Sequence, residues 1–152
     1  AFYLQRQLQL IRPNTQLLPG PGQTLGEDLA DLSPDDLFIV IGMRRRVDGV
    51  IQTLEQAARS GARSLLITDP SATRSLKLAT WTLSCEVRSV SILDSYTAVA
   101  SVLNLLCATV MSHRGRAAHE RLRRIEQFHK ELSELDQPPW FSSLLAEDDP
   151  AR

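Results

Sequence analysis

The sequence predicts a single parallel α/β domain. Its 152 residues are close to the usual size of one domain, and 43% hydrophobic with 23% charged residues is typical of a globular protein. The apolar run at 37–41 has no polar interruption, as expected for a strand covered on both faces of a parallel sheet. A stretch of helical periodicity leads from it, through Gly61, to a second strand-like run at 64–68. A strand, a helix and a strand in this order require a right-handed crossover and parallel pairing.

The first third of the chain predicts two helices with a short strand between them. Apolar residues at helical spacing predict a helix over 2–11, which Pro13 ends. We expect a short strand at 14–19 and a turn at 20–22. Leucines at helical spacing then predict a short amphipathic helix over 25–32.

The middle of the chain carries the strand–helix–strand unit. We expect 37–41 to be the central strand of the sheet, stopped by Gly42. The helix that follows has its apolar positions at Val47, Val50, Ile51, Leu54, Ala57 and Ala58.

The last part of the chain predicts an edge strand and two longer helices. A short helix is expected at 74–79, and the alternation of apolar and polar residues at 81–87 predicts a strand at a sheet edge. The helix over 95–112 is too apolar for a surface helix, so it lies either deep in the core or at a subunit interface. The amphipathic helix over 116–135 packs either on its own domain or along a dimer seam. We therefore expect one domain over 1–135 and a loosely held C-terminal tail over 136–152.

Charge and cysteine usage narrow the classes of partner. A formal net charge of −1 gives no overall attraction to nucleic acid or to an anionic membrane. Cys85 and Cys107 lack metal or redox spacing and lie among apolar residues, as expected for buried, reduced thiols in a cytoplasmic protein. No signal peptide or membrane-spanning stretch is expected, and no cofactor or metal is implied.

Two loops that follow predicted strands carry residues suited to an anionic ligand. The segment Gly42-Met43-Arg44-Arg45-Arg46 places three cations at a helix N-terminus, where they oppose the helix dipole. A bound anion would relieve that conflict, and arginine is well suited to phosphate. The alternative is a solvated basic turn, or arginines paired with nearby acids.

The second loop contains Thr68, Asp69 and Ser71. Ligands of parallel sheets bind beyond the carboxyl ends of the strands, and both loops lie at that end. The hydroxyls and N–H groups of this loop would line the same cleft, although an ordinary Asx-type turn also accounts for it.

Catalytic patterns are weak. No nucleophile elbow, P-loop, HExxH or dinucleotide fingerprint is present. Glu86, His119 and Glu126 are the only acid–base candidates, and His119 and Glu126 are more simply explained as part of a solvated helical face.

With these residues in view, the chain resembles the sugar isomerase (SIS) domain of RpiR/MurR-type bacterial transcription regulators, from Phe2 to about Leu135. The segments that carry the resemblance are 35–41, 57–62, 66–69, 94–98 and 121–126. The resemblance implies a three-layer αβα fold with a flavodoxin-like, five-stranded parallel sheet, a homodimer or higher homo-oligomer, and phosphosugar sensing. In such regulators a separate helix-turn-helix domain binds DNA, and no such segment is present in this chain. The family's binding positions fall on Gly42, Met43, Arg44, Arg45, Arg46, Thr68, Asp69 and Ser71, with Ser95 as a weaker candidate.

Two features depart from the family pattern. The sequence opens inside a helix, so the family's first strand and its phosphate loop have no counterpart here. The loop at 43–46 has Met and Arg where the family offers Ser or Thr hydroxyls, which indicates either a more acidic ligand or a lost site.

The sequence thus leads to one main hypothesis and two alternatives. The main hypothesis is the effector-sensing and dimerising domain of a transcription regulator, not an enzyme, which binds a phosphosugar or a sugar acid. The alternatives are an aldose/ketose phosphate isomerase and a domain that only dimerises.

Overall fold

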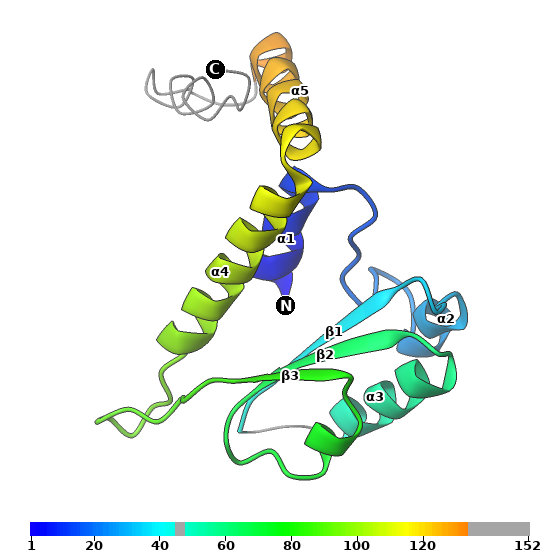
Figure 1. Cartoon of the computed structure of the whole chain (residues 1–152), viewed down its shortest axis with the longest axis vertical. Helices are drawn as coiled ribbons and strands as arrows, with labels where there is room; N and C mark the ends of the chain where they lie inside the picture. The colour runs from blue at the N-terminus through cyan, green and yellow to red at the C-terminus, as the bar shows by residue number, and fades with distance from the viewer. Residues whose placement is uncertain (45–47, 134–152) are drawn as a thin grey trace. The chain divides into compact units, whose positions relative to one another are not determined.

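The computed structural model describes residues 1–44 and 48–133 (Figure 1). The chain divides into two compact units, which we describe separately. The sheet unit contains Ala1 and residues 17–103, and the helical unit contains residues 2–16 and 104 onward. The single domain over 1–135 stays a prediction, and the tail over 136–152 lies outside the described residues.

The sheet unit is built on three parallel strands. They are β1 (Leu37–Gly42), β2 (Arg63–Thr68) and β3 (Trp81–Ser84), in the order β1-β2-β3. The parallel α/β prediction is confirmed, and β3 lies at an edge as its alternating pattern predicts. Among the described strands the centre is β2, which lies between the other two, and not the strand at 37–41 as predicted. The described residues form three strands, so the flavodoxin-like, five-stranded sheet in three layers stays a prediction.

Burial explains why β2 rather than β1 is the centre. Every β2 residue after Arg63 is buried, and Leu66 is fully so. Leu37 at the start of β1 is 47% exposed. An apolar run predicts that the two faces of a strand are covered by other parts of the protein. It does not predict whether the strand is hydrogen-bonded to one neighbouring strand or to two. That is why the sequence placed the centre on the wrong strand.

One helix covers the core of this sheet. Helix α3 (Gly49–Arg59) buries Leu54 against Val40 and Leu66. The helix is followed by Gly61, whose φ of +76° is strained for any residue with a side chain. The predicted helix and its glycine stop are confirmed, and the tight turn delivers the chain directly into β2.

The connecting segments differ from the predictions in two places. Helix α2 (Leu25–Ala30) is confirmed, while the helix expected at 74–79 is the short 3₁₀ helix η1 (Ser75–Lys77). The strand expected at 14–19 is absent from the described residues, and the prediction is wrong. Asn14 has a φ of +57°, which breaks an extended path, and Thr15 accepts a hydrogen bond at its carbonyl from Gln9 Nε2 at 3.1 Å. The segment is therefore held by a side chain of the preceding helix rather than by a neighbouring strand.

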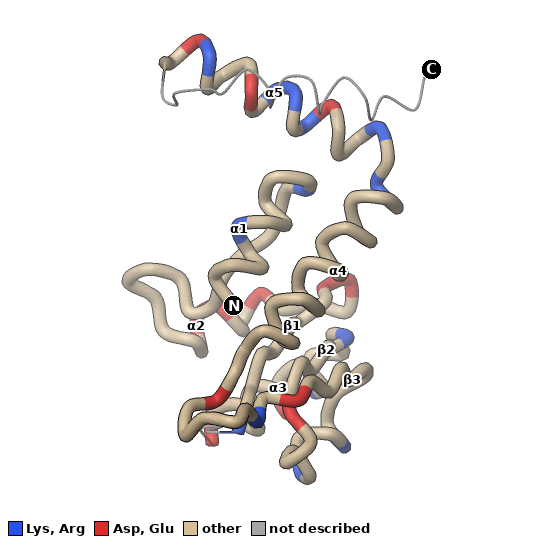
Figure 2. Tube along the Cα trace, turned by 90° about the vertical axis from the view of Figure 1, so that its left-hand side faces the viewer, with Lys and Arg blue, Asp and Glu red and all other residues tan. Residues whose placement is uncertain are grey.

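The helical unit contains α1 (Phe2–Ile11), α5 (Arg116–Leu132) and the larger part of α4 (Thr97–Arg114), whose first residues belong to the sheet unit. Helices α1 and α5 contact each other, and Arg121 Nε donates a hydrogen bond to the Gln9 carbonyl at 2.9 Å. Figure 2 shows α4 without charged residues over most of its length, whereas α5 carries both signs. In the described chain α4 is not a core helix, since it buries Val99 and Leu103 while Leu105 is 68% exposed. Of the two expectations for this helix, the subunit interface is the one that stays open.

Candidate functional site

The carboxyl ends of the three strands lie side by side, and we call this end of the sheet the carboxyl edge. It is where the sequence predicts the ligand. Gly42, Thr68 and Ser84 are register partners across this edge. The Thr68 hydroxyl is fully buried and donates to the Gly42 carbonyl at 2.6 Å. Thr68 therefore fastens the end of β1 to the end of β2 at the base of the candidate site. This use of its hydroxyl is structural.

The loop after β2 is a well-defined turn organised by Asp69. Asp69 is 3% exposed, and its Oδ1 accepts a hydrogen bond from the Ser71 backbone N–H at 3.0 Å. The Asp69 carbonyl accepts a second hydrogen bond, from the Ala72 N–H at 3.1 Å. This is the Asx-type turn that the sequence offers as the simpler account. The turn fixes the position of Ser71 close to the strand ends.

The loop after β1 presents Arg44 at the same edge. The strand ends at Gly42, Met43 is half-buried and Arg44 is exposed, while Arg45 and Arg46 lie outside the described residues. Arg44 Nη1 lies 3.5 Å from Asp94 Oδ1, and the Asp94 side chain is only 14% exposed. Asp94 belongs to the segment between β3 and α4, so the ion pair joins the loops that follow the two outer strands.

Asp94 is the site residue that sequence reasoning missed. It stands beside Ser95 just before an apolar helix, and this position alone gives no sign of a partner some fifty residues earlier. The contact depends on the parallel pairing of β1, β2 and β3, which places the carboxyl ends of both outer strands at the same end of the sheet. Only the arrangement of the strands could have shown it.

Ser95 holds the segment before α4 in place. Its N–H donates to the Val87 carbonyl at 2.8 Å, and its hydroxyl accepts from the Thr97 N–H at 3.4 Å. The Ser95 and Thr97 hydroxyls also lie 3.1 Å apart. These contacts position Asp94 toward Arg44. They give Ser95 a positioning role at this edge.

The acid–base candidates are divided between the two units. Glu86 accepts hydrogen bonds from the backbone N–H and the guanidinium of Arg88, and these two contacts hold the pKa of the Glu86 carboxyl below its usual range. A lowered pKa makes Glu86 a weaker general base. His119 lies on α5 with its Nδ1 2.9 Å from the Gly115 carbonyl, and Glu126 lies 3.7 Å from His129. His119 and Glu126 belong to the helical unit, and Glu86 belongs to the sheet unit.

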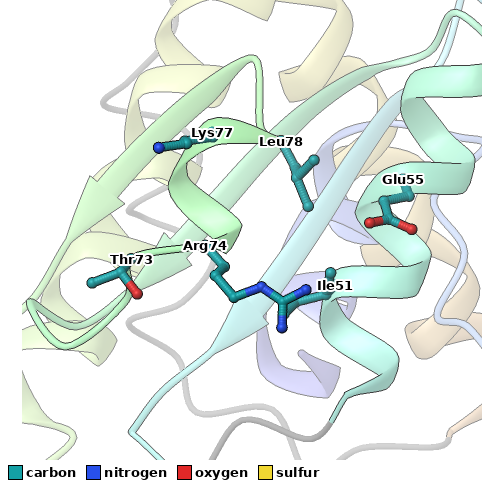
Figure 3. Close-up of a pocket in the computed structure, with 6 residues that line it drawn as sticks. All are labelled: Ile51, Glu55, Thr73, Arg74, Lys77 and Leu78. Atoms are coloured by element: carbon teal, nitrogen blue, oxygen red, sulfur yellow. The ribbon is translucent and has the colours of Figure 1, made fainter.

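A pocket of about 360 Å³ opens between α3 and the segment around η1 (Figure 3). It is lined by Ile51, Glu55, Thr73, Arg74, Lys77 and Leu78. Thr73 and Arg74 follow the Asp69 turn directly. None of these residues is among the ligand-binding positions predicted from the sequence.

Residues 1–44 and 48–133 bear on other functional classes through their metal-ligating side chains, their helices and their cysteines. They contain no group of three or more metal-ligating side chains, and none of their helices is long and apolar enough to cross a bilayer. Cys85 and Cys107 are unbridged; Cys85 is buried as predicted, whereas Cys107 is only half-buried. Burial raises the pKa of both thiols, which leaves less of the nucleophilic thiolate at neutral pH.

Comparison with known proteins finds a matching family and similar solved structures. The family model "SIS domain" matches residues 1–109. The sugar isomerase domain of an RpiR transcription factor from Sphaerobacter thermophilus is 28% identical, with a TM-score of 0.74, over 83% of this chain and 70% of that one. No curated protein matches the chain.

Proposed function

The chain belongs to the SIS domain family, and from that premise we propose that it is the effector-sensing and dimerising domain of a cytoplasmic transcription regulator. In this proposal it binds a sugar phosphate or sugar acid at the carboxyl edge of the sheet, and a separate helix-turn-helix domain contacts DNA. The similarity to the sugar isomerase domain of an RpiR transcription factor supports the regulatory role. The main support for ligand binding is the position of Arg44. Its guanidinium is exposed at the carboxyl ends of the strands and already forms an ion pair with the carboxylate of Asp94.

The chemistry of the edge supports binding rather than turnover. Thr68 and Asp69 are engaged in fastening the strand ends and shaping the loop. Glu86, the one acid–base candidate in the sheet unit, is held by Arg88 with a lowered pKa. We therefore propose no isomerase activity for this domain. Conversion of an aldose phosphate to a ketose phosphate by the purified chain would contradict this part of the proposal.

Replacing Arg44 tests the anion site directly. We expect Arg44→Met to weaken binding of inorganic phosphate or a sugar phosphate at least about tenfold, because charge-assisted hydrogen bonds contribute about 1.5–3 kcal/mol. A thermal-shift series measures this, since ligand at 100 times Kd adds about 2.7 kcal/mol of stability. Arg63→Met is the matched control, because Arg63 is exposed at the opposite end of β2. Equal binding by both variants would place the anion elsewhere.

A second candidate, a domain that only dimerises, is favoured by the same ion pair. Because Arg44 is already paired with Asp94, a ligand gains less by binding to its guanidinium. Asp94→Asn separates the two candidates, because it removes the internal competitor and leaves Arg44 intact. If Arg44 binds a ligand, phosphate should bind up to about fivefold more tightly to Asp94→Asn, because an ion pair near the surface contributes up to about 1 kcal/mol. If neither the native chain nor Asp94→Asn binds any anion, the dimerisation-only function is preferred.

Dimerisation itself is tested on the two helices that could form the interface. We expect Leu105→Glu to yield monomers in sedimentation velocity, because Leu105 is 68% exposed on an apolar helix. Ile125→Glu on α5 is the comparison, since Ile125 is part-buried within the amphipathic stripe. Monomers with Ile125→Glu alone would assign the interface to α5 instead.

A further inference from the structure

The pocket between α3 and η1 is lined by one acidic, two basic and two aliphatic side chains, together with Thr73. Figure 3 shows Arg74 extending toward Ile51 of α3, Glu55 pointing from α3 toward the pocket, and Leu78 between the two elements. The ammonium of Lys77 points away from α3 in the same view. The charged groups directed into the pocket are therefore the Arg74 guanidinium and the Glu55 carboxylate.

These two charges have no ion-pair partner among the described residues, although they line the same pocket. A purely anionic ligand would be attracted by Arg74 and repelled by Glu55, and a purely cationic ligand would meet the reverse. A ligand that carries both charges satisfies both groups. Among the described residues neither side chain has a hydrogen bond or an ion pair that a ligand would have to break first.

The remaining lining limits the ligand further. Ile51 and Leu78 offer aliphatic contact area, and the volume of about 360 Å³ lies at the small end of the range for small-molecule sites. The guanidinium of Arg74 presents a planar pair of donors that matches a carboxylate, and Glu55 accepts hydrogen bonds from an ammonium group. We propose that this pocket binds a small zwitterion with an aliphatic body, of the chemical class of the α-amino acids with branched side chains.

This inference is independent of the anion site at Arg44. The pocket is made by α3 and the segment 73–78, and none of the proposed sugar-phosphate contacts lines it. A domain with both sites would respond to two chemically different small molecules.

Three probes of matched shape test the charge requirement. L-leucine carries both charges, 4-methylpentanoate lacks the ammonium, and 3-methylbutylamine lacks the carboxylate. We expect leucine to perturb the NMR methyl signals of Ile51 and Leu78 in a saturable way. Each one-charged analogue should bind at least about tenfold more weakly, the value of one charge-assisted hydrogen bond.

Two variants test which side chain binds each charged group of leucine. Arg74→Met and Glu55→Gln should each lose at least about tenfold in leucine affinity. Arg59→Met, on the same helix as Glu55 but outside the pocket, should bind as the native chain does. Absence of leucine binding to the native chain, equal binding of the three probes, or full retention in both pocket variants would overturn the proposal. Phosphate binding, titrated separately with Arg44→Met, reports on the anion site alone, so failure of either site is distinguishable.

Discussion

Leu66→Ala is expected to lower the free energy of unfolding by about 2–5 kcal/mol, the usual cost of removing a large apolar side chain from a core. Leu66 lies in the middle of β2, has no exposed surface, and packs with Val40 and Leu54. The loss combines the transfer of the missing methyl groups and the cavity that remains. Sheet and helix contribute to the same cluster, so neither can move in to fill the cavity without disturbing the other.

Urea denaturation followed by circular dichroism measures this effect. The matched control is Leu93→Ala, the same change at a side chain that is 73% exposed in the segment between β3 and α4. We expect the control to change stability by no more than about 0.5 kcal/mol. Equal losses in the two variants would mean that the cluster around Leu66 does not hold the sheet together.

Asp69→Ala should have the second-largest effect, a loss of about 1–3 kcal/mol in stability. The change removes the acceptor of the Ser71 N–H and empties a position that is 3% exposed. The loop that begins at Asp69 would then lose the hydrogen bond that sets its course beside the strand ends. Phosphate affinity should fall as well, because the loop lines the proposed site.

Asp69→Asn distinguishes the shape of the turn from the charge of the carboxylate. Asparagine keeps a side-chain carbonyl that accepts the same hydrogen bond, so we expect most of the stability to be retained. The exposed Asp35, two residues before β1, serves as the matched site for an Asp→Ala control. A cost at Asp69 no larger than the cost at Asp35 would contradict the structural role of this turn.

The turn at Asp69 also shows how far the sequence predicts the candidate site. An aspartate followed by proline after a strand predicts an Asx-type turn from local chemistry, and the structure has it. The role of Thr68 was not predictable in the same way. Its hydroxyl binds the Gly42 carbonyl, 26 residues earlier in the chain, and that contact exists only because the two strands pair in register.

Arg44 and Asp94 show the same division for charged residues. Arginines before a helix predict a local excess of positive charge, and that excess can be read from the sequence. Which carboxylate pairs with Arg44 depends on the order of the strands, since Asp94 follows β3, on the other side of the sheet from β1. The pocket between α3 and η1 has the same origin, because its two walls are separated in sequence by β2.

The sequence by itself determined the parallel α/β class, the helices over 2–11, 25–30, 49–59, 97–114 and 116–132 to within a few residues, and the family. These features depend on periodicity, on glycine and proline stops and on short ordered motifs, all of which act between residues close in the chain. Tertiary structure alone decided that β2 is the central strand, that 14–19 is not a strand, and that Asp94 faces Arg44. The neighbours of a strand, and the ion-pair partner of a charged side chain such as Arg44, come from residues that are distant in sequence. Patterns of neighbouring residues in the sequence do not show which of these distant residues come into contact.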